Sequence, residues 1–295
     1  MEKIDYKNLE ATDLICRSSK AYIYKLKNGD ILKIFHPFIL DLYKKSNLRL
    51  EEKITSAKPF KTVPEIIVPK ISVYDDNQFI GYTCKEATGI DYNSYDDTLS
   101  ENEFHNLNRY AKEYEKLEDI IKRGNKEKIV FPDFCTCDNI FIDKKGNFSL
   151  IDYDGLQIGD FITPVLSSSL GNQEQYNCFK YQKNNLFTPE LDKKSLITLY
   201  FLSAFNIDIN KVGTLNPITR EIVTLDDIFE MIGLDDYDVQ NKVWKLFQDN
   251  KQNEFLGEDV FRIAENYDLL AIPIAKNTYI KRLIKKKQFK VTVFL

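Results

Sequence analysis

The spacing of the hydrophobic residues changes once along the chain, near Gly89. Before this point the apolar segments are short and rich in β-forming residues. The turn sequence Lys-Asn-Gly-Asp at 27–30 joins two of them, 14–24 and 31–35, and predicts a hairpin. Beyond Gly89, apolar residues recur at helical spacing, first in a long segment that begins with a capping-box pattern at 100–103. Strands followed by helices in this order predict an α+β protein.

The same pattern predicts two lobes that meet near residue 87. The first lobe, residues 1–87, is expected to be β-rich with one helix, and the second, residues 88–295, is expected to be larger and helical. The helical spacing predicts helices over 39–57 and over the strongly apolar segment 191–205. The remaining strands are expected at 67–74, 79–84, 139–142 and 148–151.

The amino-acid composition excludes several classes of protein. With 43% hydrophobic and 29% charged residues, the 295-residue chain is typical of a folded soluble protein and not of a disordered or fibrous one. A formal net charge of −4 argues against a general nucleic-acid binder. The first residues lack the apolar core of a signal peptide, and the most apolar stretch is too short to cross a bilayer. We therefore expect no transmembrane segment. Because the number of cysteines is odd and they form no regular framework, we expect a reducing, cytoplasmic setting.

Two acids and one amide flank the apolar segments at 139–142 and 148–151. Asp152 follows the second segment, Asn139 opens the first, and Asp133 lies a short loop upstream. A carboxylate can position or deprotonate a hydroxyl group. An amide carbonyl and a second carboxylate can hold Mg²⁺, which prefers oxygen ligands. The pattern therefore indicates a site for a hydroxyl substrate and a metal ion.

A lysine, Lys33, lies inside the apolar segment 31–35. Burying its ammonium group requires an anionic partner, because an isolated buried charge is costly. Glu51 or Glu52, on the helix expected next, could supply that partner and leave the ammonium directed at a phosphate group.

Taken together, these residues resemble the signature set of the protein-kinase-like superfamily, over most of the chain. The resemblance implies a two-lobed fold that binds ATP and Mg²⁺. Lys33 resembles the lysine that holds the α- and β-phosphates, and Glu51 resembles its partner on the following helix, with Glu52 as the alternative. Asp133 resembles the catalytic-loop aspartate, and Asn139 resembles the loop asparagine that binds metal.

Two more aspartates match the same signature. Asp152 resembles the metal-binding aspartate of the D-F-G motif, with Tyr153 in place of Phe and Asp154 in place of Gly. Asp192 resembles the residue that begins the large central helix of the second lobe. In that position the resemblance implies that Asp192 supports the catalytic loop.

The resemblance also assigns the nucleotide contacts. The segment 82–89 resembles the strand and hinge beside adenine, with Cys84 near the gatekeeper position. The residues whose backbone would face adenine are Lys85, Glu86 and Ala87. The glycine positions of the phosphate-binding loop fall on three small residues, Cys16, Ser18 and Ala21. Small side chains keep part of the close backbone approach, but they lack the positive-φ freedom of glycine.

Two further departures from the signature concern the catalytic loop and the substrate platform. The step from Asp133 to Asn139 is six residues, one more than in H-R-D-L-x-x-x-N, so either the loop bulges or Asp133 is not the base. No A-P-E motif is present at the usual distance, because the similar sequence at 188–190 lies only two residues before Asp192. The surface that docks a peptide substrate is therefore expected to differ.

The sequence thus predicts an ATP- and Mg²⁺-dependent phosphotransferase, with a protein Ser/Thr or a small-molecule hydroxyl as acceptor. The alternative is a pseudokinase that serves as a nucleotide-binding or regulatory interaction module. The basic C-terminal segment, 275–295, is expected to be either a solvated tail or a contact for an anionic surface or an acidic partner.

Overall fold

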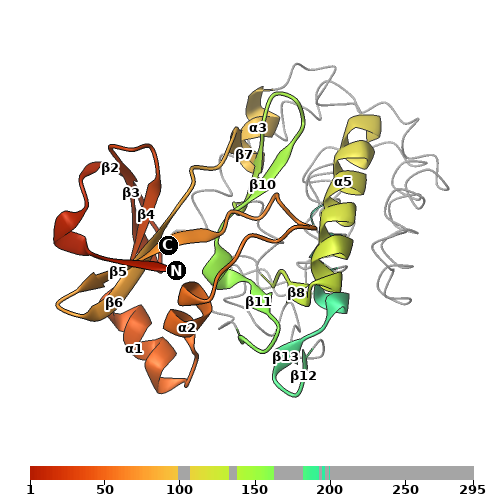
Figure 1. The fold of residues 1–295 in the computed structure, drawn as a ribbon. Coiled ribbons are helices and arrows are strands. Elements are labelled where there is room, and N and C mark those ends of the chain that lie inside the picture. The colour runs from red at the N-terminus through yellow and green to blue at the C-terminus, as the bar shows by residue number, and fades with distance from the viewer. Residues whose placement is uncertain (99–106, 133–137, 163–181, 193–194, 197–198, 200–295) are drawn as a thin grey trace, which may run out of the picture.

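The computed structural model describes residues 1–98, 107–132, 138–162, 182–192, 195–196 and 199. Its N-terminal part is built on a six-stranded sheet with the order β1-β5-β6-β4-β3-β2. The strands are β1 (Glu2–Asp5), β2 (Ala11–Arg17), β3 (Ala21–Leu26), β4 (Ile31–Phe35), β5 (Pro69–Asp75) and β6 (Gln78–Cys84). All neighbours are antiparallel except β1, which pairs in parallel with β5. Figure 1 shows this sheet in red and orange.

The turns of this sheet have the backbone geometry that their sequences predict. Gly29, between β3 and β4, has a φ of 84°, and Asp76 and Asn77, between β5 and β6, have φ values of 46° and 65°. Glycine, Asp and Asn are the residues that tolerate positive φ. The predicted hairpin is confirmed, but the strand expected over 14–24 is wrong, because a turn at 18–20 divides it into β2 and β3.

Two helices accompany the sheet in place of the one helix expected over 39–57. They are α1 (Pro37–Lys45) and α2 (Leu50–Thr55). Asn47 adopts a φ of 54° between them, and a left-handed residue ends an α-helix. Both helices bury an apolar face in the main core, including Ile39 of α1 and Ile54 of α2.

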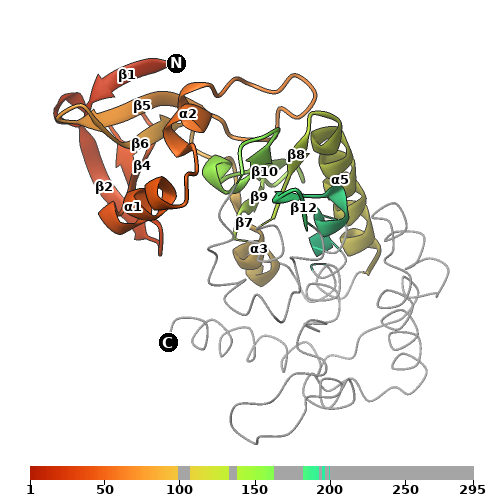
Figure 2. The same cartoon turned by 90° about the horizontal axis from the view of Figure 1, so that it is seen from below.

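The remaining elements surround a small three-stranded sheet and the helix α5 (Leu107–Lys126). The predicted strands at 139–142 and 148–151 correspond to β9 (Ile140–Ile142) and β10 (Phe148–Leu150), and are confirmed. The other elements there are β7 (Ile90–Asp91), α3 (Tyr92–Thr98), β8 (Ile129–Val130), β11 (Gln157–Ile158), β12 (Gln182–Lys183), β13 (Leu186–Phe187) and the short 3-10 helix η3 (Tyr153–Gly155). A second 3-10 helix, η1 (Tyr6–Asn8), lies against β5 of the large sheet. In Figure 2 the six-stranded sheet and α5 lie on opposite sides, with β9 and β10 between them.

The segment before β5 links the large sheet to β10. Ile67 N donates to Leu150 O at 2.8 Å, and Leu150 N donates to Glu65 O at 2.9 Å. Arg123 of α5 in turn contacts Glu65, with 2.7 Å between Nη2 and Oε1. These bonds fix the end of β10, and with it Asp152, relative to the sheet that carries Lys33.

The architecture confirms the predicted mixed α+β class. The lobe boundary at residue 87 stays a prediction. The capping box at 100–103, the basic segment 275–295 and most of the helix expected over 191–205 lie outside the described residues. Within the described part of the chain, no helix is long and apolar enough to cross a membrane.

Candidate functional site

The candidate site forms where Lys33 of β4 meets the end of β10. The Lys33 ammonium contacts the Asp152 carboxylate and lies 2.6 Å from Asp154 Oδ1. Asp152 adopts a left-handed backbone conformation, with φ 66° and ψ 48°, which is uncommon for a residue other than glycine. A Cβ at Gly155 would lie 2.6 Å from Asp152 Oδ2, so a larger residue here would displace this carboxylate.

Asp154 is the fully buried carboxylate of the site. Besides Lys33, it accepts a hydrogen bond of 2.7 Å from the Tyr82 hydroxyl. Tyr82 lies opposite Lys33 in the register between β6 and β4, so both donors reach Asp154 from one place on the sheet. Asp154 takes the position of the glycine in D-F-G and thus gives Lys33 a second anionic partner. This contact was not predicted from the sequence.

The expected ion pair between Lys33 and Glu51 is wrong, and so is the alternative with Glu52. The exposed Glu51 carboxylate accepts a hydrogen bond of 2.9 Å from Tyr74 Oη. Glu52 is also exposed and lies 3.3 Å from Arg49 Nη1. The physical reason is helical phase: Leu50, Lys53 and Ile54 form the buried face of α2, so the two glutamates point away from the site.

Lys53 takes the inward position on α2 that a glutamate was expected to hold. Its ammonium donates 2.7 Å to Asp154 O and also donates to Leu156 O. It is 2% exposed. Lys53 therefore ties α2 to the turn after Asp152 through backbone carbonyls.

Burial and charge act in different directions on these groups. Burial disfavours the Lys33 ammonium, but Asp152 and Asp154 outweigh it and raise the Lys33 pKa above its ordinary value. Burial alone would raise the pKa of Asp152, but Lys33 and Lys20 hold it below its ordinary value. For Lys53, burial dominates over the attraction of Asp154 and Asp152 and lowers the pKa to about 7. Lys33 and Asp152 are consequently both charged at neutral pH.

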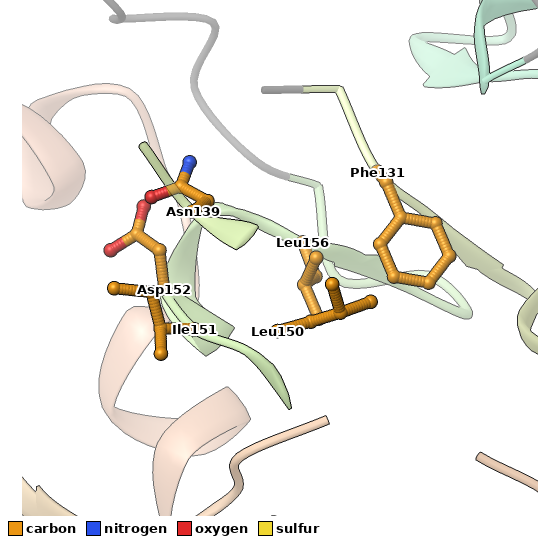
Figure 3. Close-up of a pocket in the computed structure, with 7 residues that line it drawn as sticks. Phe131, Asn139, Leu150, Ile151, Asp152 and Leu156 are labelled. Carbon is orange, nitrogen blue, oxygen red and sulfur yellow. The ribbon is translucent and has the colours of Figure 1, made fainter. Parts of the chain in front are cut away.

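Asn139 and Asp152 line one small cavity with Phe131, Leu150, Ile151, Gly155 and Leu156. In Figure 3 the oxygen-bearing ends of Asn139 and Asp152 point toward one another. Ile151 N donates to Asn139 O at 3.0 Å, so the β9–β10 pair brings the two residues together. Amide and carboxylate oxygens suit Mg²⁺, and this donor set fits that ion. No group of three His, Cys, Asp or Glu side chains that could hold a metal occurs among the residues placed by the structure, which exclude Asp133.

Asp192 lies against the segment that leads to residue 133. Its fully buried Oδ1 accepts a 2.7 Å hydrogen bond from Phe131 N. Burial raises the pKa of Asp192, and the Phe131 amide acts in the opposite direction. This bond fixes the backbone just before residues 133–137, which lie outside the described residues and include the expected catalytic Asp133.

The small residues expected to form the phosphate loop lie at the β2–β3 turn. Cys16 is exposed in β2, Ala21 is buried at the start of β3, and Ser18 lies in the turn between them. Lys20, a residue that the sequence analysis did not single out, extends from this turn to Asp152, with 3.4 Å between Nζ and Oδ2. Its sequence signal was weak, since a lysine in a turn is usually a solvated charge.

The expected adenine contacts follow the end of β6. Cys84 pairs with Ile31 of β4 and is half-buried, while Lys85 and Glu86 are exposed and Ala87 is half-buried. Glu86 Oε1 lies 2.9 Å from the Lys25 ammonium. Their role toward adenine stays a prediction.

Comparison with known proteins finds a match in structure. No protein-family model and no curated protein matches the chain. Among solved structures, the chain is similar to the kinase PK-1 of Cydia pomonella granulovirus, with a TM-score of 0.53 and 13% identity, over 90% of this chain and 95% of that one. At this identity the likeness shows the fold alone. The chain therefore has a kinase-like fold, as its sequence resemblance predicted.

Proposed function

We propose that the protein is an ATP- and Mg²⁺-dependent phosphotransferase that transfers the γ-phosphate to a hydroxyl group. One observation carries the proposal: in a kinase-like fold, the buried Lys33 contacts Asp152, which lies beside Asn139. A buried lysine held among carboxylates and an amide is suited to bind a polyphosphate with its metal ion. The acceptor is proposed to be a protein Ser or Thr, or a small-molecule hydroxyl.

Each residue of the site has a distinct proposed role. Lys33 would hold the α- and β-phosphates, and Asp154 and Tyr82 would position it through the bonds described above. Asn139 and Asp152 would hold Mg²⁺, which would neutralise charge on the phosphate oxygens. Catalysis would thus rest on positioning and charge stabilisation.

The proposed reaction moves one phosphoryl group. The acceptor oxygen forms a bond to the γ-phosphorus, while the bond from that phosphorus to the β–γ bridging oxygen breaks and its electron pair leaves with ADP. The proton of the acceptor hydroxyl passes to a carboxylate, proposed to be that of Asp133. The assignment of Asp133 rests on the sequence resemblance, because this residue lies outside the described part of the chain.

A second candidate function is a nucleotide-binding module without transfer. The observation that favours it is the absence of a helix-borne carboxylate beside Lys33 in the described structure, because α2 presents Lys53 toward the site while Glu51 is exposed. The two candidates differ in their dependence on Asp133. Only a phosphotransferase needs a group that accepts the hydroxyl proton.

Incubation with γ-labelled ATP and Mg²⁺ tests the proposal. The wild-type protein is expected to label itself or a general protein substrate, and Asp152→Asn and Asp133→Asn are expected to abolish labelling. Glu10→Gln, at an exposed ion pair with Lys27, is the control and is expected to label as wild type does. A protein that binds nucleotide but is not labelled would favour the second candidate. A protein that neither binds nucleotide nor becomes labelled would contradict both candidates.

The cellular setting is also a proposal. Cys16 and Cys84 are free thiols in the described structure, which supports a reducing compartment such as the cytoplasm. The basic segment 275–295 is proposed to contact an anionic surface or an acidic partner, on the basis of its charge.

A further inference from the structure

The turn between β2 and β3 is held rigidly without any glycine. Ser18 N donates to Ala21 O at 2.9 Å, and Ser18 Oγ accepts hydrogen bonds from Ala21 N at 3.0 Å and from Lys20 N at 3.3 Å. His36, at the start of α1, donates from its backbone N to Lys20 O at 2.9 Å, and its ring nitrogen lies 3.0 Å from Ser18 O. The backbone of this turn is thus fixed both internally and by α1.

This turn directs one cation into the candidate site. The Lys20 ammonium lies 3.4 Å from Asp152 Oδ2, and the side chain is 12% exposed. Lys33 contacts the other oxygen of the same carboxylate, Oδ1. Because Lys33 also pairs with Asp154, the two ammonium groups balance two carboxylates. A Mg²⁺ ion held by Asp152 would make this cluster positive, which would favour the binding of a polyanion.

We propose that Lys20 is a second phosphate-binding residue, and that the turn binds the nucleotide by side-chain charge in place of the backbone amides of a glycine-rich loop. The inference rests on the proposed function, since it concerns the same nucleotide. A lysine binds phosphate as a point charge and needs no particular backbone conformation. The ligand class is a nucleoside polyphosphate, because Lys20 and Lys33, together with a metal ion at Asp152, would present positive charge to more than one phosphate group.

A purely structural role for Lys20 makes a different prediction. In that case its ion pair with Asp152 would only stabilise the fold, and removing it would alter stability without regard to the ligand. If Lys20 binds phosphate, the loss of affinity on its replacement depends on the number of phosphates on the nucleotide. The ratio of the affinities for ATP and AMP therefore separates the two roles.

The test measures dissociation constants for ATP and AMP, each with Mg²⁺, by competition against a fluorescent nucleotide. We expect Lys20→Met to weaken ATP binding by about 10-fold or more, the size of a lost charge-assisted hydrogen bond. The dissociation constant for AMP is expected to change by less than about 2-fold. Lys20→Arg should keep most of the ATP affinity. The control is Lys27→Met, at an exposed ion pair with Glu10 beside the ends of β2 and β3, and it should change neither constant.

The outcomes distinguish this inference from the proposed function. Wild-type affinity for ATP in Lys20→Met, or equal weakening of ATP and AMP, would overturn the role of Lys20 and leave the proposed function standing. Failure of the wild-type protein to bind ATP would overturn the proposed function together with this inference. Melting curves of each variant show that it is folded at the temperature of the measurement.

Discussion

Replacement of Asp154 by alanine is expected to lower the free energy of unfolding by about 3–5 kcal/mol, the cost of breaking a buried ion pair by removing one partner. Asp154 is fully buried and receives Lys33 at 2.6 Å and the Tyr82 hydroxyl at 2.7 Å. Its loss leaves the Tyr82 hydroxyl without this acceptor and reduces the negative charge around Lys33. Urea denaturation followed by circular dichroism measures the change.

Two further variants sharpen this test. Asp154→Asn keeps an acceptor for Tyr82 but removes the charge, and should lie between the wild type and Asp154→Ala. Asp119→Ala is the matched control, because Asp119 is an aspartate that pairs with Arg123 at 2.8 Å but is 66% exposed. Its effect is expected to stay below about 1 kcal/mol. An equally small effect for Asp154→Ala would show that Asp154 does not hold Lys33 in the folded protein.

Lys53 is expected to make stability depend on pH above neutrality. Its pKa in the folded protein is about 7, because burial disfavours its charge, against an ordinary value of 10.5. Between these two pH values, Lys53 carries a proton in the unfolded chain but not in the folded protein. The free energy of unfolding therefore rises with pH over this window and decreases as the pH falls toward 7. Relative to Lys53→Met, the wild-type free energy of unfolding should rise by on the order of 2 kcal/mol from pH 7 to pH 9.

The measurement is urea unfolding of both proteins at the two pH values. Comparing the wild type with Lys53→Met cancels the other groups that titrate in this range. Lys27→Met is the control, since the Lys27 side chain is 67% exposed and its variant should differ from wild type by the same amount at both pH values. A constant difference for Lys53→Met as well would mean that Lys53 keeps its charge on burial.

The predictable parts of the fold are those that local sequence determines. Alternating apolar residues and turn residues such as Gly29 located the strands and hairpins of the large sheet. The break between α1 and α2 was missed because Asn47 gives a weaker stop signal than glycine, although its φ of 54° has the same effect. The division of 14–24 was missed because the Ser18 turn contains no glycine or proline.

Site residues in or next to paired strands could be predicted from the sequence. Site residues on a helix could not, because the rotational position of each residue around the helix determines whether it faces the site. Lys33 lies in β4, and Asn139 and Asp152 lie just outside the paired strands β9 and β10. The pairing of these strands limits where the three residues can lie, and the structure brings Lys33 to Asp152 and Asn139 to the same cavity. Glu51 was chosen on a helix only six residues long, where a shift of one position moves a side chain from the core to solvent. Lys20 and Asp154 reach the site only through tertiary contacts, which no local pattern signals.

A crystal structure of the protein with a non-hydrolysable ATP analogue and Mg²⁺ tests the central claim most directly. The account predicts that the Lys33 ammonium contacts phosphate oxygens and that the metal ion is coordinated by Asp152 and Asn139. A nucleotide bound away from Lys33, or a metal ion without Asp152 among its ligands, would contradict the account.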